Sequence, residues 1–227
     1  MKKKYTAFTL AEVLITLGII GVVAAMTLPV VIAKIEQRVN IDKLKREYSV
    51  LQQAFQKILE ENDVNFKNAI SGCGHSGHSC LKNLFKAKLK TIKDCDKNSG
   101  ENLSKCFVAQ KDAKQLNGKP VGSLYFNNNA TSGLLLQNGA ALSFWFDSAA
   151  CDSYKEFAKP RCAFVVLDVN GPNLRPNTWG KDLFLFFIYP NQIMPADAHN
   201  TDGSAYRNDC GVGSNYGLTC ASKYIYK

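Results

Sequence analysis

The sequence is poor in the residues and motifs that carry catalysis. It contains three histidines in 227 residues, and it has neither a phosphate-binding glycine loop nor the nucleophile turn of serine hydrolases. Gly211, Gly213 and Gly217 lack the spacing of a dinucleotide-binding loop, and no strand pattern leads into them. We therefore predict that the chain is not an enzyme.

Acidic residues are also scarce near the N-terminus, where residues 7–29 read AFTLAEVLITLGIIGVVAAMTLP and contain one acid, Glu12. As a helix, residues 8–28 would extend roughly 30 Å, which matches the hydrocarbon core of a bilayer. Lysines at positions 2–4 precede this run, and such a cationic flank stays in the cytoplasm. The pattern predicts a single membrane pass with the N-terminus inside. A carboxylate deep in lipid costs about 2.5 to 3.5 kcal/mol, so Glu12 is expected to have a partner or a function.

The first thirty residues are similar to a known processing signal. KKKYTA followed by FTLAEVLITLGIIGVVAAMTLP resembles the cleavage site and N-terminal helix of type IV prepilins and of type II secretion pseudopilins. The resemblance implies that residues 1–7 are a leader, removed before Phe8 by the membrane-embedded prepilin peptidase. It also implies that the same enzyme methylates the Phe8 amine and that Glu12 serves assembly. The family usually has Gly before the cut, where this chain has Ala7, a small residue that is expected to fit a tight subsite.

The chemistry of this site agrees with those roles. Cleavage between Ala7 and Phe8 creates an ammonium group, and Glu12 lies one helical turn further on. The carboxylate is favoured there by the helix dipole and could neutralise the amine of its own chain or of a neighbouring subunit. Two other interpretations of the apolar run are an ordinary single-pass anchor and a secretory signal peptide, for which residues 23–25 (VAA) offer a small-residue cleavage pattern.

After Pro29 the sequence becomes amphipathic. Apolar residues recur at helical spacing at Ile41, Leu44, Tyr48, Leu51, Phe55 and Ile58. The charged residues between them predict a solvated polar face, formed by Lys34, Glu36, Arg38, Asp42, Lys43, Lys45, Arg46 and Glu47. We expect one helix over residues 8–61, with its membrane-spanning half at 8–29, an amphipathic half at 30–61 and a kink near Pro29. The stripe runs for under three heptads, which leaves a coiled coil as an alternative to packing on a sheet.

Strand-like segments follow the helix. They are rich in aliphatic and aromatic residues and cover residues 134–137, 141–146, 163–168 and 183–189, with Asn138-Gly139 as a hairpin turn signal. These predict a small antiparallel sheet packed on the second half of the helix, an α+β class that the pilin resemblance also implies. The extracytoplasmic head would span residues 30–227, with a loop-rich connection at 66–120 and the sheet and C-terminal loop at 121–227.

Eight cysteines in a chain placed outside the cytoplasm predict disulfides, although eight allow 105 pairings. The simplest pairing joins neighbours: Cys73 with Cys80, Cys95 with Cys106, Cys151 with Cys162, and Cys210 with Cys220. For the last pair, the resemblance also implies a disulfide near the C-terminal edge of the head. CGHSGHSC, at residues 73–80, contains zinc ligand types, but four ligands within eight residues would need a very tight loop.

One further loop is rich in oxygen ligands. Asp168, Asn170, Asn177 and Asp182 lie in DVNGPNLRPNTWGKD, between two predicted strands. Carboxylate, amide and carbonyl oxygens are the ligands of calcium, and the loop is loosely similar to calcium-binding loops of major pseudopilins. No other cofactor is expected. The alternative is a series of turns in which Asp and Asn bond the backbone.

The formal charge of +9 is unevenly distributed. The leader holds +3, and residues 67–119 hold +7 from eleven basic and four acidic residues. Such a surface could bind DNA, but Phe66, Phe85 and Phe107 are the only aromatic residues across the region, too few for stacking on single strands, so we do not expect nucleic acid as a partner.

The resemblance implies a structural subunit that polymerises into a type IV pilus or a type II secretion pseudopilus. Its expected partners are other pilin or pseudopilin subunits, the prepilin peptidase, and an inner-membrane assembly platform with its ATPase. The head would lie in the periplasm, or outside the cell in an assembled filament. Two alternatives remain: a minor tip subunit that binds DNA or a secreted substrate, and a signal-anchored extracytoplasmic protein.

Overall fold

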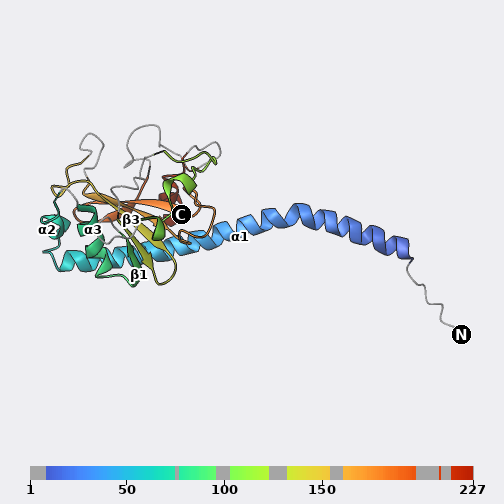
Figure 1. Ribbon diagram of the computed structural model, residues 1–227, viewed down its shortest axis with the longest axis horizontal. Helices are drawn as coiled ribbons and strands as arrows, with labels where there is room; N and C mark the ends of the chain where they lie inside the picture. The colour runs from blue at the N-terminus through green and yellow to red at the C-terminus, as the bar shows by residue number, and fades with distance from the viewer. Residues whose placement is uncertain are drawn as a thin grey trace. The chain divides into compact units, whose positions relative to one another are not determined.

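The computed structural model describes residues 9–74, 77–95, 103–122, 132–153, 161–197, 210 and 216–226. It divides into two compact units, Met1–Val39 and Asn40–Lys227, which are described separately below. The first described element is the helix α1 (Leu10–Glu60), whose residues contribute to both units. Figure 1 shows the elements in chain order.

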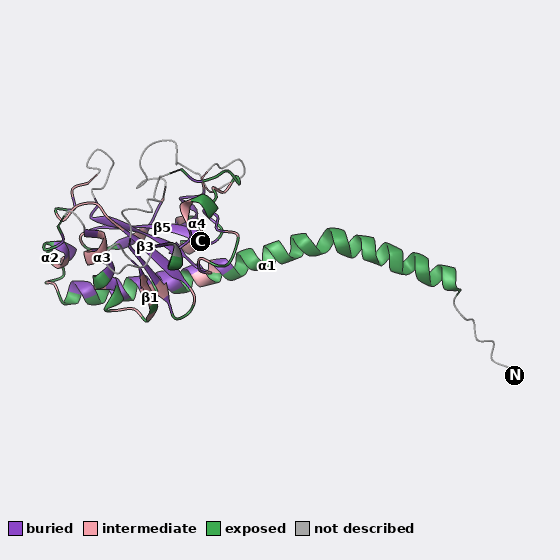
Figure 2. Cartoon of the chain, in the orientation of Figure 1, coloured by how far each residue is buried: buried purple, intermediate pink, exposed green. Residues whose placement is uncertain are grey.

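The first unit consists of the apolar part of α1. Its large hydrophobic side chains are exposed, and Figure 2 shows this part of the helix as exposed throughout. The hydroxyl of Thr16 donates to the carbonyl of Glu12 at 2.9 Å, and that of Thr27 to the carbonyl of Val23 at 3.0 Å, so both are satisfied within the helix. By length and composition the helix could cross a membrane. It stays helical through Pro29, and the kink expected there remains a prediction.

The second unit is built on a six-stranded antiparallel sheet whose strands follow one another in chain order. They are β1 (Thr91–Cys95), β2 (Ser132–Leu136), β3 (Ala141–Phe146), β4 (Ala163–Asp168), β5 (Leu183–Ile188) and β6 (Ile193–Pro195). The four central strands confirm the predicted ones, and the Asn138-Gly139 turn joins β2 to β3. The edge strands β1 and β6 were not predicted, because one carries two charged residues and the other is three residues long.

Successive side chains of a strand point to opposite faces of the sheet. Each face of this sheet carries a hydrophobic core, as the residues of β5 show. On β5, Phe184, Phe186 and Ile188 belong to a core that also contains the apolar face of α1. Of the predicted face residues, Ile41 is only partly buried, whereas the other five lie in this core, so α1 packs on the sheet as expected: Leu44, Tyr48, Leu51, Phe55 and Ile58. The alternate residues of β5, Leu183, Leu185 and Phe187, belong to a second core on the opposite face.

Residues 66–120 are more regular than the loop-rich connection that we expected. They contain the helices α2 (Phe66–Ile70) and α3 (Gly77–Lys86), strand β1, and two single-turn 3-10 helices, η1 (Leu103–Lys105) and η2 (Gln110–Asp112). Helix α3 lies close to β3, where a Cβ atom at Gly77 would be 2.2 Å from the Phe146 ring. A last helix, α4 (Cys220–Ile225), lies near the C-terminus.

The polar face of α1 is not solvated throughout. Glu47 was expected in water but is 1% exposed. The expectation failed because helical periodicity records only apolar residues, and a polar residue can be buried if a distant segment supplies its hydrogen bonds.

Candidate functional site

The N-terminal end of α1 is organised by Thr9 and Glu12. The Thr9 backbone N–H and hydroxyl donate to Glu12 Oε2 at 2.9 and 2.8 Å, and the Glu12 N–H donates back to Thr9 Oγ1 at 3.3 Å. This reciprocal arrangement is a capping box, with Thr9 at the N-cap and Glu12 three residues later. The Thr-x-x-Glu spacing was visible in the sequence, but the role of Thr9 was missed. Ala7 and Phe8, the predicted cleavage residues, lie outside the described residues.

The capping box holds the Glu12 carboxylate at the first turn of the helix, close in sequence to the predicted new amino terminus. Its hydrogen bonds come from neutral groups, so they orient the carboxylate without cancelling its charge. In an apolar setting, the negative charge therefore still requires a cation.

The eight cysteines form the four expected disulfides: Cys73–Cys80, Cys95–Cys106, Cys151–Cys162 and Cys210–Cys220. Both sulfurs of the CGHSGHSC segment are therefore covalently paired, which removes them as zinc ligands. His78 Nδ1 accepts the Phe146 N–H at 2.8 Å, and the ring lies 4.7 Å from that of Trp145. Burial lowers the pKa of His78. His75 lies outside the described residues.

The loop between β4 and β5 begins and ends on buried carboxylates, since Asp168 and Asp182 are both 0% exposed. Asp182 is well satisfied: it accepts the N–H groups of Asn177 and Thr178 at 2.7 and 2.6 Å, and the side-chain amide of Asn170 at 3.2 Å. The turn interpretation therefore explains Asp182, which holds the loop in shape.

The turn interpretation leaves three oxygens of this loop unexplained. Asp168 Oδ2, Asn170 Oδ1 and Asn177 Oδ1 are buried, and none of them has a hydrogen-bond partner. Burial, together with the nearby Asp182 charge, raises the pKa of Asp168 to about 7, an effect that the Lys43 ammonium on α1 partly opposes. Buried polar groups are almost always paired, so the three oxygens point to a missing partner.

The chemistry of these atoms fits a hard cation. They are carboxylate and amide oxygens, which calcium prefers. No cluster of three His, Cys, Asp or Glu side chains exists in the described part of the chain, so zinc-type ligation is unsupported there. Asp168 is also engaged by the backbone, because its Oδ1 accepts the N–H groups of Asn170 and Gly171 at 3.2 and 2.8 Å. The oxygens that could hold calcium are therefore Asp168 Oδ2, Asn170 Oδ1 and Asn177 Oδ1.

The same loop rests on the β2–β3 turn. Gly171 has φ +85°, and a Cβ atom there would lie 2.3 Å from the Gly139 carbonyl oxygen. Only glycine permits both the positive φ and this close approach. The loop is therefore fixed against a second tight turn, and its oxygens are held in place.

Part of the charge of the basic region is paired within the protein, although most of its described lysines are exposed. Lys82 is 1% exposed and pairs with Asp94, Lys86 bonds Asp94 at 2.6 Å, and Lys88 pairs with Glu61. Three of its lysines thus meet carboxylates within the protein, which weakens the case for a DNA-binding surface.

Comparison with known proteins adds one finding. Residues 2–28 match the family model of the prokaryotic N-terminal methylation motif. No curated protein and no solved structure matches the chain. The motif is typical of structural proteins rather than enzymes. The apolar helix that carries it fits a membrane-anchored protein. The chain therefore bears, at its N-terminus, the prepilin-type cleavage and methylation signal of type IV pilins and pseudopilins.

Proposed function

We propose that this chain is a structural subunit that polymerises into a type IV pilus or a type II secretion pseudopilus. The observation that carries the proposal is the methylation motif at residues 2–28. Residues 10–28 of the motif lie in the apolar part of α1, whose side chains are exposed. The disulfide-bonded α+β head supports it, because a long helix with an antiparallel sheet is a pilin-like arrangement. The proposed partners are pilin or pseudopilin subunits, the prepilin peptidase, and the assembly platform with its ATPase.

The proposed mechanism has two steps. The peptidase cuts between Ala7 and Phe8, which creates an ammonium group, and then methylates it. Subunits then stack so that the amine of one lies beside the Glu12 carboxylate of another. The pair replaces two unpaired charges in an apolar environment, which strongly favours association. The exposed apolar face of α1 is buried in the same event.

Glu12→Gln tests this mechanism. The variant keeps a capping acceptor for Thr9 but has no charge, so it is expected to insert and fold yet to be lost from sheared filaments. Glu36→Gln, the same change at an exposed site on the same helix, is the control and is expected to assemble normally. Mass spectrometry of the mature N-terminus reports cleavage and methylation in each variant. Normal incorporation of Glu12→Gln would contradict the assembly role, and an uncleaved N-terminus in the unmodified chain would contradict the proposed function itself.

A second proposal concerns the β4–β5 loop, where we assign a calcium site to Asp168, Asn170 and Asn177. Its support is the set of three buried oxygens without partners. Bound calcium would neutralise the buried carboxylates and fix the loop against the β2–β3 turn. The test is the melting temperature of the full chain in detergent, with calcium and with a chelator. A rise with calcium, but not with magnesium, is expected. Equal melting temperatures would exclude a site that contributes to stability.

A further inference from the structure

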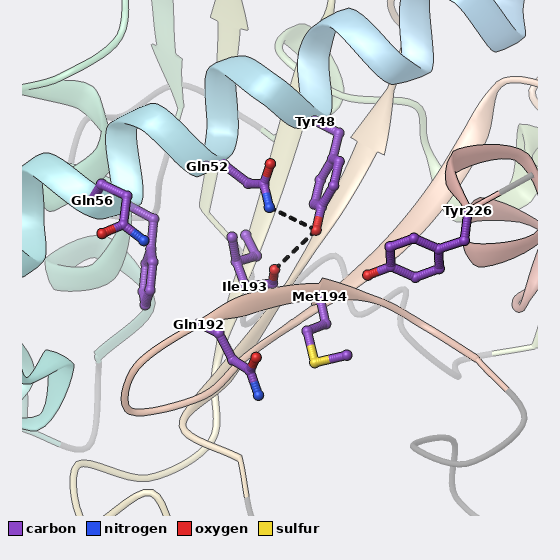
Figure 3. A pocket seen from close by; sticks show the side chains of 8 residues that line it. Tyr48, Gln52, Gln56, Gln192, Ile193, Met194 and Tyr226 are labelled. Carbon is purple, nitrogen blue, oxygen red and sulfur yellow. Dashed lines mark hydrogen bonds between the residues drawn. The ribbon is translucent and has the colours of Figure 1, made fainter.

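One hollow on the head is lined by α1, by β6 with the turn before it, and by the residue after α4. Its volume is about 410 Å³, and it is lined by Tyr48, Gln52, Phe55, Gln56, Gln192, Ile193, Met194 and Tyr226 (Figure 3). A volume of this order is typical of small-molecule sites. The lining residues come from three distant parts of the chain, so no local sequence pattern could have indicated the hollow.

Among the residues that the structure describes, none with a charged side chain lines the hollow. A charged ligand would have no counter-charge there, which favours a neutral one. Three primary amides and two phenols line the hollow, at Gln52, Gln56, Gln192, Tyr48 and Tyr226. Each amide both donates and accepts hydrogen bonds, as each hydroxyl group of a ligand would also do. This donor and acceptor set matches a polyhydroxylated molecule.

One wall of the hollow is already ordered. The Tyr48 hydroxyl donates to the Ile193 carbonyl at 3.3 Å and accepts from Gln52 Nε2 at 2.9 Å. The Tyr48 ring stacks on that of Phe186, with centroids 5.3 Å apart and planes 16° from parallel. A ligand would therefore meet a wall that needs little reorganisation, which reduces the entropic cost of binding.

Apolar surface lies beside these polar groups. Phe55 and Ile193 are buried at the hollow, and Tyr226 is 60% exposed at its opening. Figure 3 shows the Tyr226 ring extending from the C-terminal segment toward Tyr48 and Met194. An exposed aromatic ring next to three exposed side-chain amides, of which Gln52 is held by Tyr48, suits a ligand that has both an apolar C–H face and a rim of hydroxyl groups.

An extended peptide fits this edge of the sheet poorly. A peptide would bind β6 by strand addition, which requires free backbone groups on the outer side of the strand. The Ile193 carbonyl is already engaged by Tyr48, and Pro195 has no N–H to donate.

We propose that this hollow binds a neutral sugar, as a monosaccharide or as one or two units of a longer glycan. Tyr226 supplies the stacking face, and Gln52, Gln56 and Gln192 supply hydrogen bonds to ligand hydroxyls. The hollow shares no residue with the N-terminal motif, so this proposal does not rest on the proposed assembly function.

The experiment is saturation-transfer NMR on the full chain in a zwitterionic detergent, since glycoside detergents would compete. The probes are glucose, galactose, N-acetylglucosamine and maltose, each at about 10 mM because single-sugar affinities lie in the millimolar range. At least one is expected to receive saturation, and the anionic N-acetylneuraminic acid to receive little. Tyr226→Ala, at an exposed position, is expected to weaken binding at least tenfold. Leu174→Ala, at a 57% exposed site, is the control and is expected to change nothing.

Two results would overturn the proposal. One is the absence of transfer to all four neutral sugars in a chain whose circular dichroism shows it folded. The other is transfer that Tyr226→Ala and Gln192→Ala leave unchanged, because the sugar would then bind elsewhere.

Discussion

Asn138, in the turn between β2 and β3, donates its side-chain amide to both carboxylate oxygens of Glu47 on α1, at 2.9 Å each. The Asn138 Oδ1 atom accepts the Ala140 N–H at 3.1 Å, which fixes the amide in this orientation. Arg46 adds an ion pair to the same carboxylate at 2.9 Å. The most specific link between the helix and the hairpin is thus a buried acid held by the amide of a turn residue.

We predict that Asn138→Ala destabilises the head by about 2 kcal/mol, the usual cost of losing hydrogen bonds to a buried charge. Adding Glu47→Gln to the Asn138→Ala variant is expected to recover part of the lost stability, because the buried Glu47 charge is then removed. Urea unfolding of the single and double variants measures both effects. A loss below about 0.5 kcal/mol for Asn138→Ala would show that Arg46 alone compensates the Glu47 carboxylate.

We predict that Thr9→Ala frays the first turn of α1 in the unprocessed chain. Both side-chain contributions of Thr9 to the capping box are lost, since its hydroxyl accepts the Glu12 N–H and also donates to the carboxylate. Amide hydrogen exchange at Glu12 and at Val13, whose N–H donates to the Thr9 carbonyl, is expected to accelerate about fivefold in micelles, as for loss of one N-cap. Thr9→Ser keeps the hydroxyl and serves as the control. Equal exchange in Thr9→Ala and Thr9→Ser would argue against the capping role.

We predict that the head is less stable in mild acid because unfolding allows His78 to take up a proton. Burial lowers the pKa of His78, so the unfolded chain takes up this proton first as the pH falls below about 6.5. The stability that neutral His78 contributes above this pH is therefore lost as the pH drops toward the pKa of His78 in the folded chain. The raised pKa of Asp168 has the opposite effect on stability as the pH falls. Asp168 is present both in the unmodified chain and in the His78→Asn variant, so its effect cancels when the two are compared.

The measurement is the melting temperature of the unmodified chain and of His78→Asn between pH 7.5 and 5.5. The Asn Oδ1 atom can accept the Phe146 N–H in place of the imidazole. The unmodified chain is expected to lose more stability with acid than the variant, and parallel curves would refute the assignment.

Asp168→Asn is predicted to stabilise the chain when calcium is absent. The pKa of Asp168 is raised to about 7 by burial and by Asp182, so at pH 8 the ionised form opposes folding. Removing this charge is expected to gain about 1 to 3 kcal/mol. The same variant is expected to lose any stabilisation by calcium. Asp42→Asn, at an exposed site on α1 outside the loop, is the control for both measurements. A variant that still responds to calcium would remove Asp168 from the ligand set.

Regular and local features of the fold could be predicted from the sequence. The strands β3 and β4 have the predicted ends, and the four disulfides join neighbouring cysteines as expected. The elements α2, β1, β6 and α4, the last in the expected C-terminal loop, were missed because segments of three to six residues carry too little periodicity to separate from loops. Helix α3 was missed although Leu81, Leu84 and Phe85 recur at helical spacing. Their structure depends on what they pack against, as the close approach of Gly77 to Phe146 illustrates.

Three features can be recognised in the amino-acid sequence alone: the apolar run with Glu12, the helical stripe on α1 and the aliphatic and aromatic segments of the central strands. Each of these arises from residues near one another in the chain, through backbone geometry and the hydrophobic effect. Three others emerge with the folded chain: the burial of Glu47, the three oxygens of the β4–β5 loop that lack partners, and the hollow lined by Tyr48, Gln192 and Tyr226. The energy of a polar group depends on which distant atoms surround it, and that information exists only once the chain has folded.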